Sequence, residues 1–204
     1  MSLRKTSLAI VAALGSVAAT GPMSHAAYVV TFQQVGSDVV ATGSGSIDLI
    51  DLTFDGTAPN TAIINPSIGL AIVGPTGSTI ADEYSGFTGP SNFGSGSGID
   101  ATSGSGDLVG IADPVDLILP SGYVSGTPLS DTSTWSGQTF SSLGITPGTY
   151  TWTLGSAATA EPAGVDGVTG DTFTLDAVAP VPEPASLGLL GICGISLLAR
   201  RRHI

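Results

Sequence analysis

The chain has 204 residues and a formal net charge of −11, and its charges are segregated along the sequence. The five Lys and Arg residues lie near the two ends, whereas all 16 Asp and Glu residues lie within 27–184, a stretch without Lys, Arg, His or Cys. This stretch therefore cannot supply a catalytic His or Cys, a His–Cys zinc site, or the cations that neutralise nucleic-acid phosphates.

Residues 1–26 have the parts of a secretory signal peptide. Arg4 and Lys5 are positively charged, a short apolar run follows them, and small residues precede the junction of Ala26 and Ala27. Signal peptidase reads such small residues, so we expect cleavage after Ala26. An uncleaved membrane anchor is the alternative, but Gly and Pro interrupt the segment before it reaches the length of a membrane span.

Residues 27–180 predict one all-β domain. Gly, Ser, Thr, Val and Ile dominate, and apolar residues do not recur at helical spacing. Short segments separated by Gly and Pro are typical of an antiparallel β-sandwich of jelly-roll or immunoglobulin-like type. The expected strands are 28–34, 38–42, 46–54, 68–73, 108–112, 116–119, 149–154 and 172–176. Long loops are expected at 85–106 and 155–170.

The clearest strands are 149–154 and 172–176, where apolar and polar residues alternate. This period of two predicts one buried face and one face in water. Trp152 lies on the apolar face of its strand and is expected in the core. Trp135, between Thr and Ser, is the better candidate for a surface aromatic that stacks on a sugar ring.

Carboxylates are the reactive side chains that remain in the domain. Two of them can hydrolyse a glycosidic bond, but a chain this rich in acids forms close pairs by chance, so we do not expect an enzyme. Carboxylates in loops also bind Ca²⁺. Asp113 and Asp116, at a predicted turn, are the best candidates for that role, and solvated surface charge is the alternative interpretation.

The segment 181–204 is divided into three parts. Pro182, Glu183 and Pro184 come first, an apolar run at 185–199 follows, and Arg200, Arg201 and Arg202 come last. As a helix the 15-residue run would reach about 22 Å, against about 30 Å for the hydrocarbon core of a bilayer. It predicts a marginal transmembrane helix whose arginines stay in the cytoplasm. A permanent tail anchor is the alternative.

This tail resembles the PEP-CTERM sorting signal. In that family an exosortase, an integral-membrane cysteine transpeptidase of Gram-negative bacteria that make exopolysaccharide, recognises the three parts. The resemblance implies an inner-membrane precursor, removal of the tail, and delivery of the body to the cell surface or extracellular matrix. The phrases at 122–126 (Gly-Tyr-Val-Ser-Gly) and 143–150 are similar to phrases in ectodomains of that family, and they imply no activity.

Taken together, these features predict an exported protein with a structural or adhesive role in an exopolysaccharide matrix or biofilm. The alternative is a carbohydrate-binding module, with Ca²⁺ as an optional ligand and no other cofactor. The expected processing partners are signal peptidase and exosortase, and extracellular polysaccharide is a candidate partner of the mature body. Nucleic acid is excluded by the charge.

Overall fold

The computed structural model describes residues 27–112, 116–155 and 171–179. Its strands form two sheets, which we call A and B. Sheet A contains β1 (Ala27–Val35), β2 (Asp38–Gly45), β7 (Phe87–Thr88), β9 (Ser103–Gly106), β12 (Leu129–Trp135), β13 (Gly148–Leu154) and β14 (Thr172–Val178). Sheet B contains β3 (Thr53–Asn60), β4 (Ile63–Asn65), β5 (Leu70–Val73), β6 (Thr79–Ser85), β8 (Ile99–Asp100), β10 (Val109–Ala112) and β11 (Asp116–Pro120). The short helices are η1 (Pro66–Ile68) and α1 (Phe140–Leu143).

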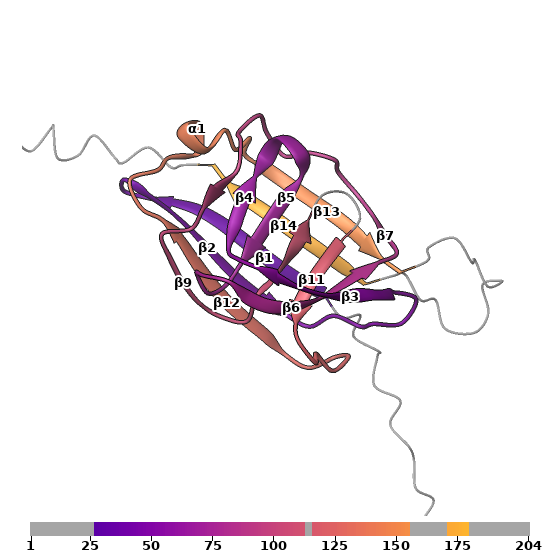
Figure 1. Cartoon of the computed structure of the whole chain (residues 1–204). Coiled ribbons are helices and arrows are strands. Elements are labelled where there is room, and N and C mark those ends of the chain that lie inside the picture. The colour runs from indigo at the N-terminus through magenta and orange to yellow at the C-terminus, as the bar shows by residue number, and fades with distance from the viewer. Residues whose placement is uncertain (1–26, 113–115, 156–170, 180–204) are drawn as a thin grey trace, which may run out of the picture.

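The order of strands is β7-β13-β14-β1-β2-β12-β9 in sheet A and β3-β6-β11-β10-β5-β4-β8 in sheet B. The first strand, β1, pairs in parallel with the last, β14, while β2 and β13 flank them in antiparallel register. Figure 1 shows β1 and β14 side by side in sheet A. The predicted all-β fold is thus confirmed, but sheet A is mixed rather than purely antiparallel.

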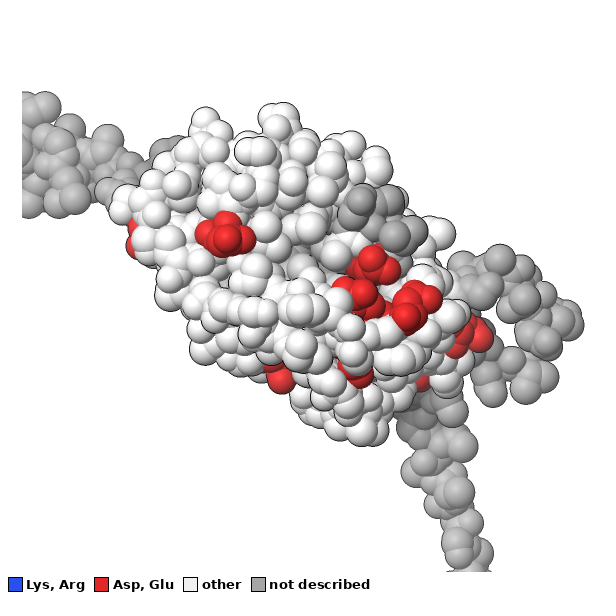
Figure 2. Space-filling model, in the orientation of Figure 1, with Lys and Arg blue, Asp and Glu red and all other residues white. Residues whose placement is uncertain are grey.

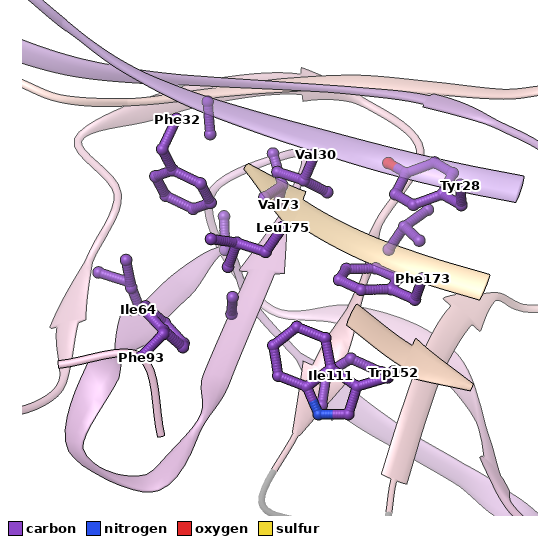
Figure 3. Packing of buried hydrophobic residues seen from close by; sticks show 14 of the residues in the cluster. Tyr28, Val30, Phe32, Ile64, Val73, Phe93, Ile111, Trp152, Phe173 and Leu175 are labelled. Atoms are coloured by element: carbon purple, nitrogen blue, oxygen red, sulfur yellow. The ribbon is translucent and has the colours of Figure 1, made fainter. Parts of the chain in front are cut away.

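The main core lies between the two sheets, because every second residue of the central strands points inward. From β1 and β14 the buried residues are Tyr28, Val30, Phe32, Phe173, Leu175 and Ala177. Figure 3 shows five of these side chains, all but that of Ala177, packed with those of Ile64, Val73 and Ile111 from sheet B. Burying large apolar side chains contributes about 1.5–3 kcal/mol each, so this contact between the sheets is the principal source of stability.

Sheet B buries apolar side chains on its other face as well. On β5, Ala71 and Val73 belong to the main core, whereas Ile72 between them joins a second, smaller cluster. That cluster consists of Ile72, Ala81, Leu108 and Ile118. Because both faces are apolar, β5, β10 and β11 read as continuous apolar runs rather than as alternating strands.

The predicted strand at 46–54 is wrong over most of its length, because β3 begins only at Thr53. The Asp48 side chain accepts a hydrogen bond from the backbone N–H of Ile50 (3.0 Å), which favours a turn over a strand. Asp51 has a φ of 64°, a left-handed conformation that ends extended structure. The segment is therefore a loop that leads into an edge strand.

The predicted loop at 85–106 is also partly wrong. It contains the short strands β7, β8 and β9, and Phe93 within it is buried in the main core. The other expected loop, 155–170, falls almost entirely outside the described residues. The predicted signal peptide (1–26) and transmembrane helix (185–199) lie outside them too. Within the described ranges no helix has the length and apolar character needed to cross a membrane.

Candidate functional site

The strand that leads to the C-terminal tail lies in the interior of sheet A. β14 has β13 on one side and β1 on the other, with six and seven pairs of facing residues respectively. Its inward residues Phe173, Leu175 and Ala177 are at most 2% exposed. The alternation Thr-Phe-Thr-Leu-Asp-Ala-Val places these residues on one face and polar ones on the other, which is the reason that the sequence predicts this strand.

Side chains connect β14 to both of its neighbours. On the buried face Phe173 stacks on Tyr28 of β1 (ring centroids 5.4 Å apart) and meets the edge of Trp152 of β13 (5.8 Å). On the outer face the Thr149 hydroxyl donates to the Asp176 carboxylate at 3.1 Å. Each face thus has contacts that hold the register of the strand.

The two chain ends of the domain lie at opposite ends of sheet A. Ala27, the first residue of β1, is paired with Thr172, whereas Val178, the last residue of β14, is paired with Gln33. In Figure 1 the start of β1 and the end of β14 accordingly lie on opposite sides of the molecule. The predicted cleavage junction, Ala26–Ala27, falls at the start of β1, although Ala26 lies outside the described residues.

Acidic side chains gather around the end of sheet A where β1 begins. There the Asp171 carboxylate accepts from the backbone N–H of Asp48, and Asp107 accepts from Ser130 N–H. Most of the acidic surface visible in Figure 2 lies on that side of the molecule. Because Asp171 holds a backbone group of the loop after β2 and Asp107 holds one at the start of β12, part of the acidity has a structural role.

One carboxyl group is buried beside the core. The Tyr28 hydroxyl donates to Asp131 Oδ2, while Asp131 Oδ1 lies against Gly43 of β2. Burial raises the pKa of Asp131 to about 7, and the charge of Asp107 raises it further, against the opposing effects of the Tyr28 hydrogen bond and of the Gly43 backbone. Burial also raises the pKa of Tyr28, so its hydroxyl stays protonated. The pair can hold a proton near neutral pH, and its enclosure leaves no room for a substrate.

The predicted Ca²⁺ pair is only half within the described residues. Asp116 is half-buried at the start of β11, where it is paired with Ala112, and Asp113 lies outside the described ranges. Among the described residues no three His, Cys, Asp or Glu side chains are grouped closely enough to hold a metal ion. A Ca²⁺ site at Asp113 and Asp116 stays a prediction.

Trp135 is not a surface aromatic, and that prediction is wrong. Its side chain is fully buried, its Nε1 donates to the Ile99 carbonyl oxygen (2.9 Å), and its ring lies 5.6 Å from that of Phe32. Trp152 is buried as predicted. Neither tryptophan is available to stack on a sugar.

The Gly-Tyr-Val-Ser-Gly segment at 122–126 lies at the end of the domain where the acidic side chains gather. The Tyr123 hydroxyl accepts from the backbone N–H of Ile47 (3.0 Å) and lies 2.8 Å from the Thr127 carbonyl oxygen. The Ser125 hydroxyl donates to the Asp48 carboxylate at 2.6 Å. The phrase therefore joins the loop after β11 to the loop after β2, and its role in this structure is to hold loops together.

A hollow of about 340 Å³ opens on the outer face of sheet B, beside the second apolar cluster. Ile63, Leu70 and Ile72 contribute apolar surface, and Asn60, Thr61 and Ser78 contribute polar groups. Asn60 Nδ2 donates to the Glu83 carboxylate at 3.1 Å, and among the described residues the lining of the hollow is apolar, amide and hydroxyl groups without a carboxyl group.

The tail that follows β14 can be compared with known proteins. A profile of the PEP-CTERM protein-sorting motif matches residues 180–202, beginning two positions after Val178. No curated protein and no solved structure matches the chain. The matched range includes the Pro-Glu-Pro triplet at 182–184 and the arginines at 200–202, and it confirms the resemblance drawn from them. The chain therefore carries a PEP-CTERM sorting motif, a signal that routes proteins to exosortase-dependent export to the cell surface.

Proposed function

We propose that the protein is a non-catalytic structural or adhesive component of the cell surface, associated with exopolysaccharide or biofilm. The observation that carries this proposal is the direct attachment of the sorting motif to the domain. The motif begins two positions after β14, an interior strand of sheet A, so the tail emerges from a rigid part of the body.

The route that we propose starts with signal peptidase, which removes residues 1–26. The segment 185–199 then holds an inner-membrane precursor in a Gram-negative cell, with the body outside and Arg200–Arg202 inside. Exosortase removes the tail and delivers the body to the surface or matrix. Seven steps of the chain separate Val178 from the start of the apolar segment at 185, and even fully extended they could span no more than about 25 Å, which limits how far the body lies from the membrane during processing.

The surface of the body limits what it can contact. Its described residues include many carboxylates and no cation, so at low salt it repels other copies of itself and acidic polymers. Contacts with a matrix would then use the uncharged Ser- and Thr-rich faces of sheet A, or divalent cations that bridge carboxylates. Both kinds of contact suit a component dispersed through a polysaccharide layer.

Deletion of the gene in the native host tests this proposal. We expect less adherent biomass and less cell-bound polysaccharide, both restored by the complete chain but not by a chain that ends at residue 179. Restoration by the truncated chain would show that surface routing is not needed. A deletion strain with normal adhesion and normal matrix, in a host that displays the protein, would refute the structural role.

Carbohydrate binding is the second candidate, and the hollow on sheet B is the observation that favours it. An apolar floor with hydroxyl and amide groups at its rim fits a sugar ring, although both tryptophans are buried. A glycan array with and without Ca²⁺ tests it. Binding that is lost in Asn60→Ala but kept in Asn92→Ala, an exposed residue outside the hollow, would support it. An array without signal would leave only the structural role.

A further inference from the structure

The pairing of the first strand with the last determines how the body responds to a pulling force. β1 and β14 run in parallel through seven facing pairs, from Ala27 with Thr172 to Gln33 with Val178. A tether beyond Val178 and a load near Ala27 therefore pull on opposite ends of the two strands. From this geometry we propose that the body is a mechanical element, which transmits force along β14 and resists unfolding under it. The proposal rests on the structural role proposed above.

The direction of the force decides how the strands separate. When two paired strands are pulled at opposite ends, every hydrogen bond between them is loaded at once and all must fail together. When they are pulled apart at the same end, the bonds fail one after another, each under the full force. β14 is also paired along its other edge, through six facing pairs with β13, so it is held in the sheet on the side away from β1. The ladder that carries the load between Ala27 and Val178 is therefore that of β1 with β14.

Side chains oppose sliding in the same direction. A shift of one residue would exchange the faces of β14, moving Phe173 and Leu175 out of the core and Thr174 into it. A shift of two residues would keep the faces but break the ring contacts of Phe173 with Tyr28 and Trp152. Neither shift offers a low-energy intermediate, so the strand holds its register until the ladder of β1 with β14 fails.

A test uses the complete chain, purified in detergent, with DNA handles on two introduced cysteines and with Cys193→Ala. In the shear variant, Ala27→Cys and Ala179→Cys place the handles at opposite ends of the β1–β14 pair. In the matched control, Ala27→Cys and Thr172→Cys place them at the same end of the same pair. Optical tweezers then measure the unfolding force of each variant at one loading rate.

We expect an unfolding force several-fold higher for the shear variant than for the control. Equal forces would overturn the proposal. Both variants should unfold at the same urea concentration, because the handles change the direction of the force and not the fold. The adhesion assay gives a separate result. A higher force for the shear variant, together with normal adhesion in the deletion strain, would refute only the proposed function. Equal forces for the two variants, together with lost adhesion in the deletion strain, would refute only the mechanical role.

Discussion

At the scale of single residues, Asp131 makes the stability of the domain depend on pH. Its folded pKa of about 7 lies above the ordinary value of 3.8, so the folded state binds the proton more tightly than the unfolded chain. The resulting stabilisation is complete below about pH 4 and is lost as the pH rises towards 7. We therefore expect the free energy of unfolding, measured in urea, to decrease over this interval.

Asp131→Asn should remove that pH dependence, since the amide keeps an oxygen that can accept from the Tyr28 hydroxyl and never ionises. At pH 8 we expect it to be more stable than the wild type by roughly 1–3 kcal/mol, because the wild type must then bury an ionised carboxylate whereas the amide is neutral. Asp55→Asn, at an exposed site, serves as the control and should leave the slope unchanged. Parallel pH profiles of wild type and Asp131→Asn would contradict this account.

Gly43 lies on β2, between the strands that carry Tyr28 and Asp131, and is packed against both side chains. A Cβ at this position would overlap the Tyr28 hydroxyl and Asp131 Oδ1, so Gly43→Ala must displace both groups. We expect a loss of about 1–3 kcal/mol in urea unfolding, the usual cost of overpacking. At Gly98 a Cβ would meet its nearest neighbour, Asn65 Nδ2, at an ordinary 3.6 Å, and Gly98→Ala should cost much less. Equal losses of unfolding free energy in Gly43→Ala and Gly98→Ala would contradict the tight packing beside Gly43.

At the scale of elements, the sequence predicted the strands whose patterns are simple. β13 and β14 alternate cleanly because one face is core and the other is water. β12 was not predicted, because its buried positions include Asp131 and Ser133 between Leu129 and Trp135, which hides the apolar alternation. Ser133 is tolerated there because its hydroxyl donates to the Gly74 carbonyl oxygen and accepts from the Gly74 N–H. Such partners are distant in the chain and invisible to a local pattern.

The sequence likewise predicted one part of the candidate site and missed another. The sorting motif could be found because its recognition elements are contiguous in sequence. The Tyr28–Asp131 pair could not, because its members are 103 residues apart and meet only after sheet A forms. Trp135 was placed on the surface because its neighbours are polar, yet a strand that alternates buries every second residue whatever the neighbours are.

The tail is the element for which routing can be tested directly. Glu183→Ala, or alanine at all of Arg200–Arg202, removes a recognition element, and we expect the precursor to accumulate in the membrane fraction. Fractionation and immunoblotting measure this, with Asp55→Asn as a control that removes an acid from the body instead of from the motif. Normal release of both tail variants would contradict recognition through these residues.

At the scale of the whole molecule, the excess of carboxylates should make stability depend on salt. Like charges repel in the compact state, and the Debye length falls from about 30 Å at 0.01 M salt to about 10 Å at 0.1 M. We expect the melting temperature to rise over this range, and to be equal in NaCl, MgCl₂ and CaCl₂ at matched ionic strength. Extra stabilisation by Ca²⁺ alone would instead establish a specific site, and Asp116→Asn would then test whether it lies at Asp113 and Asp116.

The position of β14 also has a consequence for the order of events during export. Among the described strands, β13 and β1 are joined in sheet A only through this last strand, so the sheet cannot close until 172–178 have crossed the membrane. In export that proceeds N-terminus first, nearly the whole body is therefore outside before the two ladders of β14 form. The sorting motif, at 180–202, follows directly in the sequence. For a chain that is threaded N-terminus first, the ladders of β14 can therefore form only when the motif has reached the membrane.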